Sequence, residues 1–410
     1  MCTFAAPTAS ANEHIAISLD EAIARTLAQN PNLTAFGYQL EAQRGRLIQS
    51  EFRPNVELGV MVENALGSGD VTGVDSAEAT FSLAWVLERG KRDRRIAAAS
   101  AGVSLVESRA EIVRLDEASE TARRFLESLA NQERLKRLQE AVELAEQTVT
   151  AVAERVRAGR TPDADLARAK AQHARVRLAR EDIEHELVTS IHRLSAQWGA
   201  TQPGFNRVMG QIDQLPKPVG FAALLSRVEE NPDLSNYFTE QRLREAELRL
   251  AEAEAKPNWR LSAGIRHLER SNDQAFVAGI TIPLASRNRN QGRIAEARAK
   301  LAMSDAEQAA KRVELETRLF ALYQEYQHSL HRIRVLADEV LPRVEEALSD
   351  TQAAYTSGRY GYMELQLVQA EVLDARGALV DANINANRRL IEIERLTGTT
   401  LSSVVAQPKG

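Results

Sequence analysis

Residues 55–63 read NVELGVMVE, a stretch in which every second side chain is apolar. Three further stretches, 79–87, 258–266 and 275–283, alternate in the same way. A period of two is that of a β-strand, so each stretch predicts a strand with one apolar face and one polar or small face. Strands of about 9–11 residues are long enough to cross a membrane at a tilt. A soluble hairpin packed on the rest of the chain is the alternative.

The polar faces of these strands carry charges, which favours a watery lumen over a packed hairpin. The candidates for lining such a lumen are Glu57, Glu63, Arg260 and Arg266, with loop or interface positions as the alternative. The first two strands are joined by residues 64–76, a glycine-rich stretch whose only charges are aspartates, as suits an exposed outer loop. Four strands cannot close a barrel, whereas three chains supply twelve, an even number typical of closed outer-membrane barrels. We therefore expect a homotrimer, although the sequence allows other multiples.

The strands belong to two copies of one pattern that is about 200 residues long. Asn30-Pro31 recurs as Asn231-Pro232, 201 residues later, and Gly159-Arg160 recurs as Gly358-Arg359, 199 residues later. Ordered repetition of such landmarks indicates a duplication. We assign residues 1–11 to a separate N-terminal segment, 12–201 to a first repeat, 202–219 to a proline-containing linker, 220–401 to a second repeat and 402–410 to a C-terminal tail.

Each repeat is expected to place helices around its strands. In the first repeat a capping box at Ser18–Glu21 opens a short helix, and further helices cover 33–52, 93–158 and 162–198; in the second they cover 234–255, 292–356 and 362–397. Apolar residues alternate at spacings of three and four along 135–156, which predicts a coiled-coil seam. Pro342 predicts a kink in the second long helix. Because the two shorter helices together match the long one, we expect them to stack end to end beside it.

Composition agrees with a mainly helical protein. Charged residues make up 27% of the chain and aromatic residues only 5%, which is typical of long helices and coiled coils. The net charge of −5 argues against a nucleic-acid partner. No apolar run is long enough to predict a transmembrane helix. The absence of phosphate-binding, zinc-protease and nucleophile-elbow motifs predicts that the chain is not an enzyme and uses no cofactor, and its histidines, including His328 and His331, form no convincing metal site.

The first eleven residues are small and uncharged, unlike the rest of the chain. Ala9-Ser10-Ala11 fits the pattern that signal peptidase cleaves, so we interpret this segment as the remnant of a signal peptide. A disordered N-terminus is one alternative. Lipid modification of Cys2 is another, although no lipobox precedes it.

Several of these landmarks resemble those of the TolC-type outer-membrane efflux proteins, over about residues 17–401. The resemblance rests on the repeated Asn-Pro pairs, on Pro54 and Pro257 before the strands, and on the Gly-Arg turns. Two junctions, 88–92 (ERGKR) and 282–294 (IPLASRNRNQGRI), are similar to those of the heavy-metal, cobalt–zinc–cadmium branch.

The resemblance implies a mainly α fold with a small membrane β part. A homotrimer would form a 12-stranded β-barrel in the outer membrane of a Gram-negative bacterium, continued by an α-helical barrel in the periplasm. The chain would be the passive exit duct of a tripartite, RND-type efflux system for heavy-metal cations, working with a periplasmic adaptor and an inner-membrane pump. The alternatives are a duct for multidrug efflux or type I secretion and, in another class, a soluble periplasmic scaffold or adaptor.

Two sets of residues near the Gly-Arg turns are candidate sites. Asp165 and Glu364 lie just past the turns and 199 residues apart, so three chains would bring six carboxylates to one end of a tunnel as a gate. Their alternative role is that of acids favoured at helix starts. The expected adaptor-docking residues are Gly159, Arg160, Thr161, Pro162, Gly358, Arg359, Tyr360 and Gly361, whose alternative role is ordinary turn chemistry.

Overall fold

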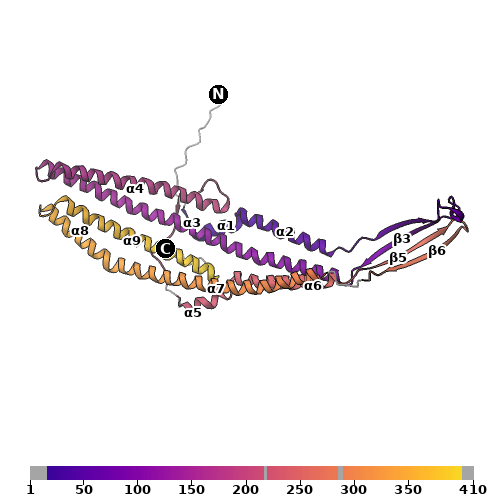
Figure 1. Ribbon diagram of the computed structural model, residues 1–410. Helices are drawn as coiled ribbons and strands as arrows, with labels where there is room; N and C mark the ends of the chain where they lie inside the picture. The colour runs from indigo at the N-terminus through magenta and orange to yellow at the C-terminus, as the bar shows by residue number, and fades with distance from the viewer. Residues whose placement is uncertain (1–15, 217–218, 285–289, 399–410) are drawn as a thin grey trace, which may run out of the picture. The chain divides into compact units, whose positions relative to one another are not determined.

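The computed structural model describes residues 16–216, 219–284 and 290–398 (Figure 1). The proposed signal-peptide remnant, Cys2, the C-terminal tail and residues 285–289 of the second junction lie outside these ranges. The chain divides into two compact units. The first takes residues from 1–35, 111–231 and 313–410, and the second takes 36–110 and 232–312. Each unit therefore draws on both halves of the sequence.

The order of elements runs almost twice through the same series. The first series consists of α1 (Leu19–Gln29), α2 (Pro31–Glu51), β2 (Glu57–Glu63), β3 (Glu78–Leu87), α3 (Lys91–Arg157) and α4 (Asp163–Ser195). The second consists of α5 (Phe221–Val228), α6 (Pro232–Glu254), β5 (Trp259–Leu268), β6 (Asp273–Thr281), α7 (Gln291–Val335), α8 (Leu341–Thr356) and α9 (Tyr362–Thr397). Helix α5 was not predicted, because it is too short to show a clear helical period.

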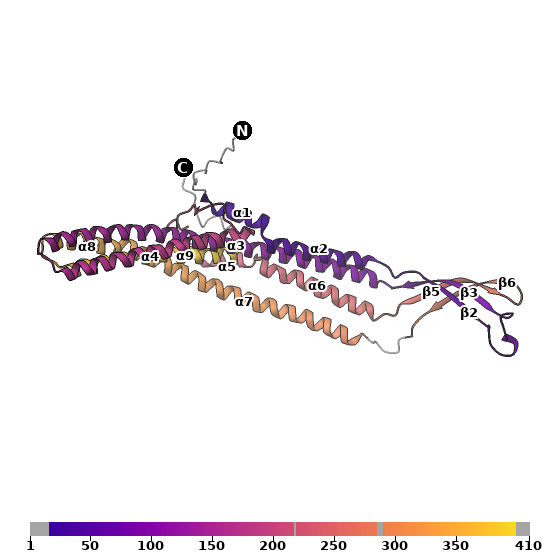
Figure 2. The same cartoon turned by 90° about the horizontal axis from the view of Figure 1, so that it is seen from above.

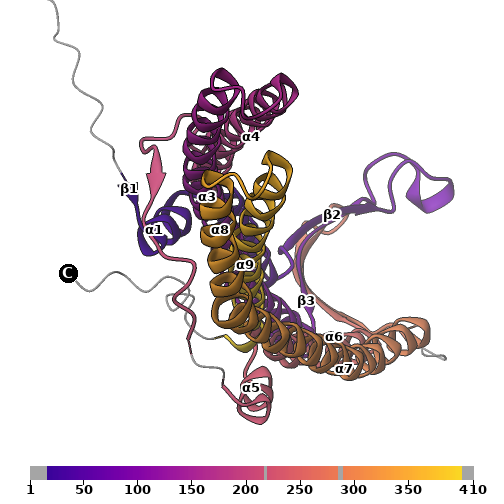
Figure 3. The ribbon, with the colours of Figure 1, turned by 90° about the vertical axis from the view of Figure 1, so that its left-hand side faces the viewer.

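The second unit holds one four-stranded antiparallel sheet in the order β2-β3-β5-β6. Strands β3 and β5 pair along their whole length and satisfy each other's backbone groups, so the two hairpins form one sheet. The sheet is curved (Figure 3). Strand β6 begins two residues before the predicted start because Asn272, with a φ of 53°, closes a tight turn between Leu268 and Asp273.

The first unit contains two helical hairpins, formed by α3 with α4 and by α8 with α9 (Figures 2 and 3). The predicted kink at Pro342 takes the form of a π-helical turn at Leu336–Val340, in which the Leu341 N–H donates to the Leu336 carbonyl. The wider turn accommodates a proline that has no N–H to donate. Helix α4 begins at Asp163, so Pro162 precedes the first helical residue instead of occupying that position.

The side chain of Asn30 joins the turn that follows α4 to the start of α2. Its side-chain nitrogen donates to the Gln197 carbonyl, in the 3₁₀ turn (Ala196–Trp198) that follows α4, at 2.8 Å, and to Glu117 on α3, also at 2.8 Å. Its side-chain oxygen accepts from the first backbone N–H groups of α2, those of Asn32 and Leu33. One buried amide thus caps α2 and binds the end of α4.

Asn231, the equivalent residue in the second half of the chain, makes a similar bond to the end of a helix. It is fully buried, and its side-chain nitrogen donates to the Leu396 carbonyl at the end of α9, at 2.6 Å. Each of the two repeated asparagines therefore binds a backbone carbonyl at or just beyond the end of a helix, α4 in the first half and α9 in the second.

The segment between the two halves is docked on the first unit. Its short strand β4 (Arg207–Val208) pairs in parallel with β1 (Ala16–Ile17), and the Gln132 side chain bonds both the N–H and the carbonyl of Val208. The Tyr326 hydroxyl, on α7, donates to the Pro216 carbonyl at 3.1 Å.

Tyr326 gives this docking a predicted pH dependence. Burial, with a smaller contribution from Glu394, raises the pKa of Tyr326 to about 12. Since the folded pKa lies above the unfolded one of about 10, the stabilisation is complete below pH ~10 and is lost as the pH rises toward 12. We expect Tyr326→Phe to flatten this part of the stability profile in thermal melts between neutral pH and pH ~12. Tyr38→Phe, an exposed control, should leave the profile unchanged, and identical profiles for wild type and Tyr326→Phe would contradict the assignment.

Candidate functional site

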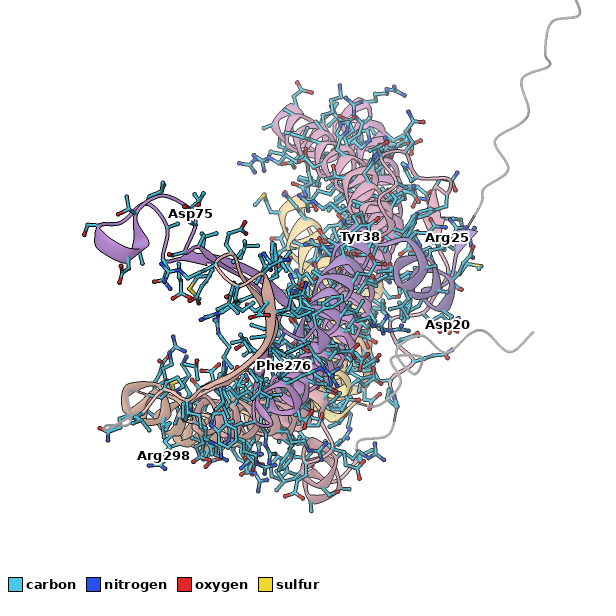
Figure 4. The ribbon with its side chains drawn as sticks, turned by 90° about the vertical axis from the view of Figure 1, so that its right-hand side faces the viewer. Asp20, Arg25, Tyr38, Asp75, Phe276 and Arg298 are labelled. Atoms are coloured by element: carbon cyan, nitrogen blue, oxygen red, sulfur yellow. The ribbon has the colours of Figure 1, made fainter. Side chains whose placement is uncertain are left out.

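One face of the sheet is apolar and exposed. A row of paired residues, Val60, Phe81, Ile265 and Phe276, crosses all four strands on this face. Its exposed large apolar side chains run from 40% for Trp85 to 76% for Phe276, which Figure 4 labels on β6, whereas Trp259 and Leu261 on β5 are half-buried. A contiguous apolar patch of this kind marks a surface that another apolar phase or protein covers. No helix of the described residues is both long and apolar enough to cross a membrane.

The opposite face holds the four predicted lumen candidates, and the structure brings them together in pairs. Arg260 on β5 reaches across β3 to Glu57 on β2, with 2.6 Å between Nη1 and Oε2. Arg266 reaches Glu63 in the same way, with 3.0 Å between Nη2 and Oε2. Both pairs therefore lie on the polar face, as the period of two predicted.

Arg266 has two further partners that the sequence analysis missed. Its Nη1 donates to Glu78 at 2.8 Å, and its Nε donates to the Thr80 hydroxyl at 3.0 Å. Both partners lie on β3, between the strands that carry Arg266 and Glu63. Only the pairing of β3 with β5 could have revealed them, because nothing in their local sequence marks them.

Beyond the strands, the ends of the hairpins are held by hydrogen bonds. Arg270, in the turn after β5, donates to the Asp70 carbonyl at 2.9 Å and to the Ser76 hydroxyl at 2.6 Å. These bonds tie the turn to the loop between β2 and β3, where Figure 4 labels Asp75. At the other end, Arg92 of the ERGKR junction and the nearby Arg95 donate to backbone carbonyls of Ser50, Glu51 and Phe52 at the end of α2.

The two Gly-Arg turns have the same backbone geometry. Gly159 and Gly358 both have positive φ angles, 70° and 82°. In each turn the arginine N–H donates at 2.9 Å to the carbonyl five residues earlier, and the glycine N–H donates to the carbonyl three residues earlier. This is the Schellman arrangement that ends helices at glycine. The predicted docking residues therefore form two matching turns.

Arg155, which the sequence analysis did not single out, links the two turns. Its Nη1 donates to the Tyr355 carbonyl at 2.6 Å, its Nε donates to the Thr161 hydroxyl at 3.4 Å, and its guanidinium lies 4.6 Å from the centre of the Tyr355 ring. Tyr355 and Tyr362 pack with Val152, Ala169 and Leu365 in a buried cluster beneath the turns. Burial raises the pKa of both tyrosines, and Asp165 adds to the shift.

The two gate candidates make local contacts near the starts of α4 and α9. The Glu364 carboxylate accepts the Gly361 N–H at 3.1 Å, so it caps α9. Asp165 is largely buried and lies 3.9 Å from Arg168 on the next turn of α4. These contacts agree with the role of acids at helix starts, and the gate role stays a prediction. In the described ranges, no group of three or more His, Cys, Asp or Glu side chains is placed to hold a metal ion.

A groove with a volume of about 450 Å³ lies among α3, α4 and α9 in the first unit. Its apolar lining consists of Leu138, Ala141, Val176, Ala179, Ile183, Leu373 and Val380. Ion pairs surround it, among them Arg134 with Asp381 at 2.7 Å and Arg137 with Glu140 at 3.1 Å. An apolar floor with a charged rim is suited to binding an amphipathic helix.

Comparison with known proteins defines the class. Residues 225–399 match the family model described as outer membrane efflux protein. This match agrees with the resemblance to outer-membrane efflux proteins inferred from the sequence. The description of that family names efflux, in line with the expectation that the chain is not an enzyme.

Among its relatives is the cobalt-zinc-cadmium resistance protein CzcC of Cupriavidus metallidurans, which is 26% identical over 368 residues, covering 90% of this chain and 85% of that protein. It agrees with the branch indicated by the two junctions. The structure is similar to that of CusC, with a TM-score of 0.77, 17% identity and coverage of 93% of this chain and 92% of that one. VceC of Vibrio cholerae gives a TM-score of 0.75, 18% identity and coverage of 93% and 96%. These two likenesses show the fold.

Proposed function

We propose that three copies of this chain form a passive exit duct through the outer membrane, extending into the periplasm. The observation that carries this proposal is the sheet with two unlike faces. Its exposed apolar face has the character of a lipid-facing surface, and its opposite face presents ion-paired charges suited to water. A soluble scaffold or adaptor would leave this apolar face exposed to water, so we favour the duct.

The edges of the sheet support assembly from several copies. Strands β2 and β6 are the two edges, and each is paired on one side only. An open edge in a membrane leaves backbone groups without hydrogen bonds, which is costly in lipid. Pairing of β6 with β2 of the next copy removes both edges, and three copies give the 12-stranded barrel that the α-helical barrel continues.

The helical hairpins are the proposed contact region for a periplasmic adaptor, through which an inner-membrane pump would supply the energy. The turns at 159–162 and 358–361 are its proposed docking points, and Arg155 holds them in a fixed relation. An adaptor helix would pack on the apolar floor of the groove among α3, α4 and α9, between its charged edges.

Heavy-metal cations are the proposed cargo, since CzcC is named for resistance to cobalt, zinc and cadmium. Multidrug efflux and type I secretion are the alternative uses of the same duct. Deleting the gene and measuring growth in zinc, cobalt, cadmium, copper and common drugs tests the proposal. We expect sensitivity to metals, restored by a plasmid copy, whereas sensitivity to drugs alone would contradict the metal assignment.

Asp165 and Glu364 remain proposed as charges at the periplasmic end of the tunnel. We expect the double variant Asp165→Asn/Glu364→Gln to lower cation preference in planar bilayers, because six carboxylates would become neutral amides. The amide oxygen that replaces the Glu364 carboxylate can still accept the Gly361 N–H, so stability should stay within about 1 kcal/mol of wild type. The measurement is the reversal potential in a salt gradient. A double variant that assembles but shows an unchanged potential would leave these acids only their capping role.

A further inference from the structure

The charges on the polar face follow the duplication of the chain. Arg260 stands 203 residues after Glu57, and Arg266 stands 203 residues after Glu63. Each arginine on β5 therefore occupies, in the second repeat, the position that a glutamate occupies on β2 in the first. Equivalent positions of the two repeats carry opposite charges, and each pair meets across the single intervening strand β3.

A closed barrel would repeat this geometry between chains. If β6 pairs with β2 of the next copy, Arg260 lies two strands away from Glu57 of that copy, just as Glu57 lies two strands away from Arg260 of its own chain. The intervening strand β6 places Thr281 opposite Arg260 and Gly279 opposite Ser262, and both residues are uncharged. Nothing charged on β6 at this level competes for the arginine.

The pair Arg260–Glu57 and the pair Arg266–Glu63 differ in how many nitrogens of the arginine have no hydrogen-bond partner. Arg260 uses only Nη1, and its Nε and Nη2 have no hydrogen-bond partner among the described residues. Its side chain and that of Glu57 are each half exposed, at 51%. Arg266 instead uses all three of its nitrogens within the chain, on Thr80, Glu78 and Glu63. Arg260 is therefore free to bind a second carboxylate, and Arg266 is saturated.

We propose that Glu57 and Arg260 form an interaction surface for a second copy of this chain. In the trimer, Arg260 of each copy binds Glu57 of the next as well as its own, so that six residues of alternating charge form a ring around the lumen. This inference rests on the proposed trimeric barrel. The ring joins neighbouring copies through opposite charges, whereas the level of Glu63 and Arg266 is held within each chain.

Mixed trimers separate contacts between chains from contacts within a chain. Glu57→Arg and Arg260→Glu each place like charges at this level in every contact, so each variant alone should assemble poorly. When the two variants are co-expressed with different tags, every contact within a chain remains between like charges. A mixed trimer, however, contains two junctions between unlike chains. At one junction the native Arg260 of the first variant meets the native Glu57 of the second, and at the other the two replaced side chains meet. Opposite charges therefore meet at both junctions.

We expect the ratio of mixed to unmixed trimers, isolated through the two tags, to exceed the random ratio about fivefold. The reason is that two junctions of a mixed trimer bring opposite charges together, whereas every junction of an unmixed trimer brings like charges together. The control pair, Glu78→Arg with Arg266→Glu, should show no such excess, because Glu78 lies on the inner strand β3 and its contact with Arg266 is made within a chain. The chain carrying both Glu57→Arg and Arg260→Glu should assemble like wild type, since all contacts are then between opposite charges.

If wild type forms trimers, either of two results would overturn the ring. One is a random ratio of mixed trimers, and the other is failure of this double variant to assemble. Absence of trimers from wild type itself would instead overturn the proposed function.

Discussion

Val60→Arg is expected to abolish assembly of the protein in the outer membrane. Val60 lies at the centre of β2, on the apolar face, and is 58% exposed. If that face meets lipid, an arginine there costs about 2–4 kcal/mol in each copy. Three copies multiply this cost, and it falls on an edge strand that must also pair with the next chain. The measurement is the fraction of the protein that runs as a heat-sensitive trimer on gels of the outer-membrane fraction.

The matched control is the next residue along the strand. Met61 is 53% exposed, but its side chain lies on the polar face, where Arg266 pairs with Glu63 and Glu78. Met61→Arg should therefore assemble at close to the wild-type level. Equal assembly of the two variants would show that the apolar face does not meet lipid.

The second large effect is expected from Asn30→Ala. The variant loses the cap on α2 and the donor to the Gln197 carbonyl together, and it leaves backbone groups unsatisfied where the structure is buried. We expect the free energy of unfolding to fall by about 2–4 kcal/mol. Thermal unfolding of the purified protein, followed by circular dichroism, measures the change.

Two further variants make this test specific. Asn32→Ala removes only an exposed contact with Glu117 and should cost less than about 1 kcal/mol. Asn30→Asp keeps the acceptor for the N–H groups of α2 but loses the donor and places a second carboxylate beside Glu117. It should be as destabilising at neutral pH as Asn30→Ala. If Asn30→Ala and Asn32→Ala unfold alike, Asn30 does not join the two helices.

The sequence predicted the faces of the strands well because a period of two assigns each side chain to a face without knowledge of its partner. It could not predict that β3 pairs with β5, since strand order depends on contacts between distant parts of the chain. For the same reason it missed Arg155, whose partner Tyr355 lies 200 residues away, and Glu78, which lies 188 residues from Arg266.

Asn30 and Asn231 illustrate a different limit. Both were visible as repeated landmarks, but an Asn-Pro pair is also ordinary turn chemistry. Their role depends on carbonyls at the ends of helices 167 and 165 residues away, which only the folded chain brings near. The short elements α5, β1 and β4 were missed because two to eight residues carry too little periodicity to predict an element.

The most direct test of the account is the mass of the native protein extracted from outer membranes in mild detergent. Native mass spectrometry should find the protein in the outer-membrane fraction as a complex of three chains, which separates into single chains on heating. A protein recovered entirely as a single chain from the soluble periplasmic fraction would contradict the duct.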